Sequence, residues 1–314
     1  AEELAGSPKD PECCPHCNYA HAVRKGRAPD GSQRWLCHGC RRTFGSRTMG
    51  LIAASKLDAS TWMMFAACMA DGLDLRTTAL RVGVCLKTAW FMRHRVCEAM
   101  ASRLSGMRPG GRIQIDGTYL PENISGNHAK GSFEMPRKAR RRGREGVGRG
   151  ISNDLVCIMT GVNDMGDCFC ELSCRGRETV DDVKAALSGR VGPGSAVESD
   201  LHSSYPRAVA ALGASSHAVF DPKDRSGGDI NMVNSLHSRL GSFLERFNGV
   251  ATRRLQHYLD WFCWTEQFRK TDGDVREILY THETEGRYET TIREYALTPH
   301  PFMEHWARVN SGLT

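Results

Sequence analysis

The sequence of 314 residues contains no run of about 18 consecutive apolar residues, the minimum for a transmembrane helix. Its first 20 residues lack the basic and apolar blocks of a signal peptide, so we expect no membrane span and no secretion. No segment repeats at a period of roughly 20–50 residues, which argues against a solenoid or a propeller. The 40% of hydrophobic and 25% of charged residues are typical of a globular protein of two or three domains.

The 13 cysteines are an odd number, spread over a chain too long for a disulfide mini-scaffold. Four of them form two C-x2-C pairs, Cys14 with Cys17 and Cys37 with Cys40, separated by 19 residues. Two thiolates on one tight turn can face one ion, and a hairpin can bring the second pair to it. This spacing predicts a zinc ribbon over residues 11–48 with a structural Zn²⁺. A disulfide pair and unliganded thiols are the alternatives.

Positive charge is concentrated in the first half of the chain. Residues 1–150 hold 25 Lys and Arg against 13 Asp and Glu, a balance of +12, whereas residues 151–314 hold 17 against 23, a balance of −6. This asymmetry indicates a part that binds a polyanion joined to another part. The densest basic run lies in residues 121–150, which are expected to be a long insertion between two strands. This run is either a solvated loop or an arm that contacts phosphates. Its basic members are Arg137, Lys138, Arg140, Arg141, Arg142, Arg144 and Arg149.

Residues 55–105 are expected to be helical and to contain a helix-turn-helix. The predicted helices are residues 60–70, 75–81 and 86–100, the first capped by Asp58 or Ser60. Gly83 suits the tight turn between the second and third helices. In a helix-turn-helix the start of the later helix enters the major groove of DNA. The residues that this would expose to DNA are Lys87, Thr88, Trp90 and Arg93. A plain three-helix bundle is the alternative.

From residue 111 to residue 263, short apolar strands alternate with helices, which predicts a mixed α/β domain. The expected strands are residues 112–119, 156–162, 168–174, 196–200 and 216–220, and the expected helices are 179–187, 203–212 and 231–247, the last interrupted at Gly241. This order is that of an RNase H-like domain, whose first and fourth strands lie side by side. Asp116 and Asp200 would then meet at adjacent strand ends.

Two neighbouring carboxylates repel each other, and a divalent cation relieves the repulsion. Hard oxygen ligands favour Mg²⁺ or Mn²⁺, and two such ions stabilise the attacking and leaving oxygens of phosphoryl transfer. The alternative is that Asp116 and Asp200 are ordinary aspartates at strand ends.

Taken together, these motifs resemble those of bacterial insertion-sequence transposases with an N-terminal zinc ribbon, a helix-turn-helix and a DDE-type RNase H-like domain. The resemblance covers about residues 11–263 and is carried by the two cysteine pairs and by residues 41–44, 115–119, 135–138, 198–200, 231–235, 247–252 and 258–261. It implies cleavage of transposon ends and joining of their 3′-hydroxyls to target DNA. It also implies Asp116 and Asp200 as metal ligands, a homodimer or higher oligomer on double-stranded DNA, and a place in the bacterial cytoplasm at the nucleoid.

The resemblance puts Asn234 at the third metal-ligand position, where most such enzymes have Glu. An amide oxygen can ligate Mg²⁺ but carries no charge, so metal binding should weaken. Gly241 stands where the family commonly has Lys or Arg, although Arg239 and Arg246 remain as DNA contacts. His237, almost one helical turn after Asn234, is expected to pack or to form a hydrogen bond near the site.

These departures favour a second hypothesis, a weakened or domesticated transposase that binds DNA without cutting it. A third hypothesis is an RNase H-like nuclease that acts on structured DNA or hybrids. Residues 1–10 are interpreted as a tail. Residues 264–314 are charged and weakly periodic, and we expect a C-terminal tail to which no role is assigned.

Overall fold

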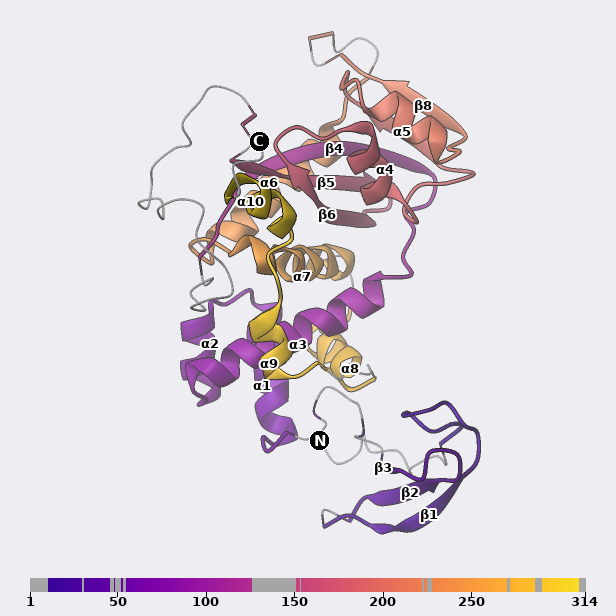
Figure 1. Cartoon of the computed structure of the whole chain (residues 1–314), viewed down its shortest axis with the longest axis vertical. Helices are drawn as coiled ribbons and strands as arrows, with labels where there is room; N and C mark the ends of the chain where they lie inside the picture. The colour runs from indigo at the N-terminus through magenta and orange to yellow at the C-terminus, as the bar shows by residue number, and fades with distance from the viewer. Residues whose placement is uncertain are drawn as a thin grey trace.

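The computed structural model describes residues 11–29, 31–45, 48, 52, 55–125, 151–152, 154–221, 223–224, 228–269, 272–285 and 290–310. It has a mixed α/β architecture, with a small antiparallel sheet near the N-terminus and a five-stranded mixed sheet flanked by helices (Figure 1). The basic run of residues 137–149 lies outside the described residues. In the part of the chain that the structure describes, no helix is long and apolar enough to cross a membrane.

The small sheet follows the order β1-β2-β3 and is antiparallel throughout. Its strands are β1 (Ala22–Arg27), β2 (Gln33–Cys37) and β3 (Thr43–Gly45). Trp35 pairs with Phe44 across β2 and β3, and their ring centroids lie 6.0 Å apart. These two rings and the thiols of Cys14 and Cys37 form a buried cluster of their own. We call residues 11–45 the cysteine module.

Three helices follow: α1 (Ala59–Ala70), α2 (Leu75–Val82) and α3 (Leu86–Leu104). Asp58 caps α1 by accepting a hydrogen bond from Thr61 N–H, and Asp74 caps α2 in the same way. Gly83 ends α2 in the left-handed conformation, with φ +74°, which costs glycine little. The three predicted helices are therefore confirmed. Aspartate caps set the starts of α1 and α2 locally, whereas α3 has no capping side chain at Cys85.

The five-stranded sheet has the order β6-β5-β4-β7-β8. Its strands are β4 (Arg112–Pro121), β5 (Leu155–Asn163), β6 (Cys168–Arg175), β7 (Ala196–Ser199) and β8 (Ser216–Val219). The first three form an antiparallel meander, and β7 runs parallel to β4 and to β8. The predicted adjacency of the first and fourth strands is confirmed: Gln114 pairs with Glu198.

Helices cover both faces of this sheet. On one face lie α4 (Val180–Leu187) and α5 (Tyr205–Ala211). On the other lie α6 (Asn231–Glu245), the short 3₁₀ helix η2 (Thr252–Arg254) and α7 (Leu255–Phe268). Side chains alternate along a strand, so Ile113 and Ile115 of β4 pack toward α4 and α5. Gln114 and Asp116 consequently face α6.

A single hydrophobic core joins the first helices to the sheet, with α7 between them (Figure 1). It contains Trp62 of α1, Met92 of α3, Ile158 of β5, Leu236 of α6 and Trp264 of α7. The helical segment 55–105 and the segment 111–263 therefore do not have separate cores. The predicted division did not anticipate this, because periodicity indicates which face of a helix is apolar but not what it packs against.

The prediction of a C-terminal tail from residue 264 is wrong. Helix α7 continues to Phe268 and is followed by α8 (Val275–Glu285), α9 (Ile292–Leu297) and α10 (Met303–Asn310). Leu279 of α8 is fully buried in the shared core, with Val275 and Ile278 packed against it. These positions have helical spacing, but the charged residues around them hide the pattern.

The predicted interruption of α6 at Gly241 is also wrong, since the helix is continuous from Asn231 to Glu245. A glycine costs about 1 kcal/mol relative to alanine within a helix. The buried side chains Leu236, Leu240 and Leu244 offset that cost. A Cβ atom at Gly241 would meet nothing within 4 Å, so a larger side chain fits there.

Two histidines, buried His94 of α3 and half-buried His257 of α7, join these helices. Nδ1 of His94 and Nδ1 of His257 lie 2.9 Å apart, and the ring of Tyr295 of α9 packs beside both. Burial, the second imidazole and the positive charge of Arg254 lower the pKa of His94 to about 2. Burial and Arg254 lower the pKa of His257 to about 4, against the opposing charge of Glu98.

These depressed values predict a loss of stability in acid. Because the folded-state pKa of His257 lies below its ordinary value of 6.5, the unfolded chain takes up a proton that the folded chain refuses. The free energy of unfolding should fall as the pH drops from 6.5 toward 4. In His257→Asn, whose amide can still pair with His94, this decline should be shallower by about 1.4 kcal/mol per pH unit. Urea unfolding of both proteins across this range measures it, and parallel pH profiles would contradict it.

Candidate functional site

The cysteine module brings all four predicted thiols together. The Sγ atoms of Cys14, Cys17, Cys37 and Cys40 lie within 4.8 Å of one another. The Cys14–Cys40 separation is 3.7 Å and the Cys17–Cys37 separation is 3.6 Å. In a tetrahedral site with Zn–S bonds of about 2.3 Å, two sulfurs lie about 3.8 Å apart. The cluster can therefore hold a metal such as zinc, and Cys13 is not part of it.

Removal of zinc should unfold the cysteine module and leave the rest of the protein folded, because their buried clusters are separate. Hydrogen exchange with and without a chelator measures this: backbone amides of β1 and β2 should lose protection, and those of β5 should keep it. Elemental analysis is the control. Less than one zinc ion per chain in the purified protein would contradict the zinc assignment.

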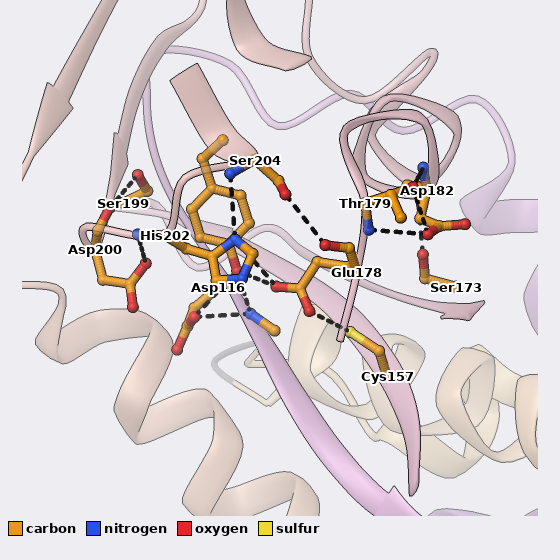
Figure 2. A network of polar contacts seen from close by, with 12 residues as sticks. Asp116, Cys157, Ser173, Glu178, Thr179, Asp182, Ser199, Asp200, His202 and Ser204 are labelled. Carbon is orange, nitrogen blue, oxygen red and sulfur yellow. Dashed lines mark hydrogen bonds and ion pairs between the residues drawn. The ribbon is translucent and has the colours of Figure 1, made fainter. Parts of the chain in front are cut away.

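The parallel pairing of β4 and β7 brings the predicted aspartates to the same end of the sheet. Asp116 lies on β4, and Asp200 directly follows β7, where its Oδ1 accepts a hydrogen bond from His202 N–H at 2.9 Å. Figure 2 shows Asp116 between Asp200 and Glu178. Burial and then the negative charge of Asp200 raise the pKa of Asp116 to about 7, although Gly117 N–H and Tyr205 O–H oppose the shift. The site thus holds negative charge that its protein neighbours only partly stabilise.

Glu178 also belongs to this site, although the sequence analysis did not assign it there. Glu178 lies outside α4, which begins at Val180, because Thr179 caps the helix and forms a capping box with Asp182. The Glu178 side chain is buried and accepts hydrogen bonds from the hydroxyls of Tyr119 and Tyr205. Burial raises its pKa, but these hydrogen bonds and nearby His202 outweigh burial, so the net shift is downward.

Gly117 makes room for this arrangement. A Cβ atom at Gly117 would lie 3.0 Å from Glu178 Oε1 and 3.4 Å from the Tyr205 hydroxyl. Without it, the Tyr205 hydroxyl reaches Asp116 Oδ1 at 3.3 Å and Glu178 Oε1 at 3.0 Å. The Tyr205 hydroxyl therefore lies between the two carboxylates, and its single proton can be donated to either of them. The glycine next to Asp116 was the sequence signal for a close approach.

Gln114 positions α6 relative to these strands. Its buried amide nitrogen donates to Glu198 Oε2 and to Asp229 O, both at 2.9 Å. Its Oε1 accepts from Met232 N–H at 2.9 Å and from Val233 N–H at 3.3 Å. Helix α6 has no capping side chain of its own at Ile230. A glutamine of β4 thus caps the first turn of α6 and connects it to β7.

Replacement of Gln114 by Met should reduce the free energy of unfolding by about 2–4 kcal/mol, because buried polar groups at α6 and β7 lose their partners. The amides of Met232 and Val233 should also exchange hydrogen faster. Gln114→Glu is the control: it keeps the acceptor for these amides but places a second charge beside Glu198. Unchanged exchange in Gln114→Met would show that this glutamine does not cap the helix.

Helix α6 carries Asn234, the third ligand implied by the resemblance, and His237, which was expected to lie near the site. Asn234 is exposed, and its main chain bonds with Ile230 O and the Ser238 hydroxyl. His237 lies beside Asp116, and its Nδ1 is 3.9 Å from Asp116 Oδ2. Burial lowers the pKa of His237 to about 4.

Among the described residues, the four cysteines are the only group of three or more His, Cys, Asp or Glu side chains with ligand atoms within 4.8 Å of one another. The ligand atoms of Asp116, Asp200 and His237 are more widely spaced, so these residues do not form a closed ligand set.

The predicted DNA contacts on α3 differ in their exposure. Lys87 is exposed at the start of α3, and Thr88 beside it is half-buried. Arg93 is wrongly predicted as an exposed contact, since only 1% of it is accessible. Its guanidinium donates to Leu73 O at 2.7 Å and lies 5.2 Å from the centre of a Trp261 ring. It therefore stabilises the junction between α3 and α7.

Two further predicted contacts lie on α6. Arg246 is exposed and lies against Gly72, whereas Arg239 forms an ion pair with Glu266 of α7 at 2.9 Å. Together with Arg269 they line a hollow of about 370 Å³ between α6 and α7. The predicted contacts at 137–144 lie outside the described residues.

Comparison of the chain with models of known protein families, with curated proteins and with solved structures found no match.

Proposed function

We propose that the chain is a DNA transposase that binds transposon ends and catalyses metal-dependent DNA cleavage and strand transfer. The observation that carries the proposal is the meeting of Asp116 and Asp200 at one end of a β6-β5-β4-β7-β8 sheet. This strand order agrees with an RNase H-like fold. The cysteine cluster and the helices α2 and α3 precede it, in the order of the resembling transposases.

The donor chemistry of the site fits a divalent cation. Asp116 and Asp200 offer carboxylate oxygens, which suit Mg²⁺ or Mn²⁺, and the raised pKa of Asp116 reflects charge that a cation would neutralise. When bound, such ions stabilise the negative charge on the oxygens of a phosphoryl transfer. Tyr205 orients Asp116 through its hydrogen bond, and Gln114 holds α6 beside it.

Basic side chains supply the proposed DNA-binding surface. Lys87 and Thr88 begin α3, where a recognition helix meets the major groove. The run at 137–149 and Arg246 would contact phosphates, and Arg239 would have to leave Glu266 to do so. Handling two ends at once requires at least a dimer on DNA. The matching location is the bacterial cytoplasm, at the nucleoid.

A second candidate is a DNA-binding protein derived from a transposase that has lost cleavage. Two residues favour it. Asn234 brings no charge to the site, and Gly241 leaves open space on α6 at the position where a Lys or Arg side chain of the resembling transposases would contact DNA. The pair of retained aspartates argues for the first candidate.

A strand-transfer assay with Mg²⁺ or Mn²⁺ tests the proposal. The donor is the DNA that flanks the gene, and the target is a plasmid. The wild type should give joined products. Asp116→Ala and Asp200→Ala should reduce them by at least about 10³-fold, because these carboxylates would hold the cations that stabilise the charge of the reacting phosphate. Asp181→Ala, an exposed acid on α4, is the matched control and should keep full activity.

Equal activity in Asp116→Ala and the wild type would refute the site. Specific binding of the flanking DNA without any product would favour the second candidate. In that case Asn234→Glu combined with Gly241→Lys should restore product, since both side chains enter exposed or open positions.

A further inference from the structure

The contact between His237 and Asp116 has a defined proton arrangement. The Thr160 hydroxyl of β5 donates to the main-chain oxygen of Asp116 at 2.9 Å. The same hydroxyl oxygen lies 2.7 Å from His237 Nε2. A hydroxyl has a single proton, so in this second bond it accepts, and Nε2 carries the hydrogen. The other ring nitrogen, Nδ1, then has a free lone pair in the neutral imidazole.

That lone pair is directed to the site. His237 Nδ1 lies 3.9 Å from Asp116 Oδ2, and 16% of the His237 side chain is exposed. At 3.9 Å the two atoms are too far apart for a hydrogen bond, so the lone pair of Nδ1 is not used by Asp116. Two ligands of one ion, each at about 2.1 Å, are separated by at most about 4.2 Å, and this pair meets that limit.

We propose that His237, and not Asn234, is the protein's third ligand to the catalytic cation, with Asp116 and Asp200 as the other two. The inference rests on the proposed function for the identity of the site. Thr160 orients the imidazole from behind, as hydrogen-bond partners of metal-bound histidines do. Asp200 must turn toward the pair to complete the set, since the three residues do not form a closed set in the structure.

A nitrogen ligand changes the preference of the site for metals. Carboxylate and amide oxygens suit Mg²⁺, whereas imidazole favours first-row transition ions. A site of two aspartates and His237 should therefore prefer Mn²⁺ to Mg²⁺ more strongly than a site of two aspartates and Asn234. The ratio of the two affinities distinguishes a ligand from a residue that only supports the fold.

Mn²⁺ binding to the zinc-loaded full chain without DNA tests the proposal, with free Mn²⁺ measured by electron paramagnetic resonance and Mg²⁺ as competitor. His237→Ala should raise the Mn²⁺ Kd at least about tenfold and lower the preference for Mn²⁺ over Mg²⁺. Thr160→Val should raise the Kd by about 10–100-fold, while Thr160→Ser, which keeps the hydroxyl, should bind as the wild type does. Asn234→Ala should leave the Kd unchanged.

An unchanged Kd and metal preference in His237→Ala, with weaker binding in Asn234→Ala, would overturn the proposal. If His237→Ala does not fold, His237→Gln and the two Thr160 variants give the same comparison. Metal binding is measured without DNA, so its outcome is independent of strand transfer. Active protein with Mn²⁺ binding insensitive to His237 refutes this inference alone, and inactive protein with sensitive binding refutes the proposed function alone.

Discussion

The parallel pairing of β4 with β7 is the interaction on which the candidate site depends. It sets Gln114 opposite Glu198 and brings Asp116 and Asp200, each two residues farther along its strand, to one end of the sheet. Side chains alternate with a period of two, so a slip of one residue in either strand would turn an aspartate away from α6. The hydrogen bond between Gln114 and Glu198 connects the two strands in this register.

The carboxylates of the site differ in how their charge is stabilised. Glu178 is buried, but two tyrosine hydroxyls donate to it, and its pKa falls. Burial and then the charge of Asp200 raise the pKa of Asp116 to about 7, because Asp116 receives fewer such bonds to oppose them. Glu178 therefore acts as a structural acceptor that holds Tyr205, whereas Asp116 is the carboxylate that gains most from a bound cation.

Helix α7 unites parts of the chain that the sequence suggests are independent. Trp261 receives the guanidinium of Arg93 from α3, and its indole N–H donates to Met69 O of α1. On its other side, Gln256 exchanges hydrogen bonds with main-chain atoms of β6. The first helices and the sheet thus share one hydrophobic core.

The sequence by itself determined the helices and strands between residues 59 and 245 and their order, but not the helices α8 to α10. Caps such as Asp58, Asp74 and Gly83 act within a few residues, and apolar alternation marked the five strands, so these predictions needed no distant contact. The cysteine spacing likewise predicted the cluster of four thiols. Only the tertiary structure decided which side chains meet. Glu178 lies in the site, and Arg93 is buried in the core. His237 of α6 lies 3.9 Å from Asp116. The reason is physical: burial and hydrogen-bond partners of a charged or polar side chain come from elements distant in sequence, and periodicity carries no information about them.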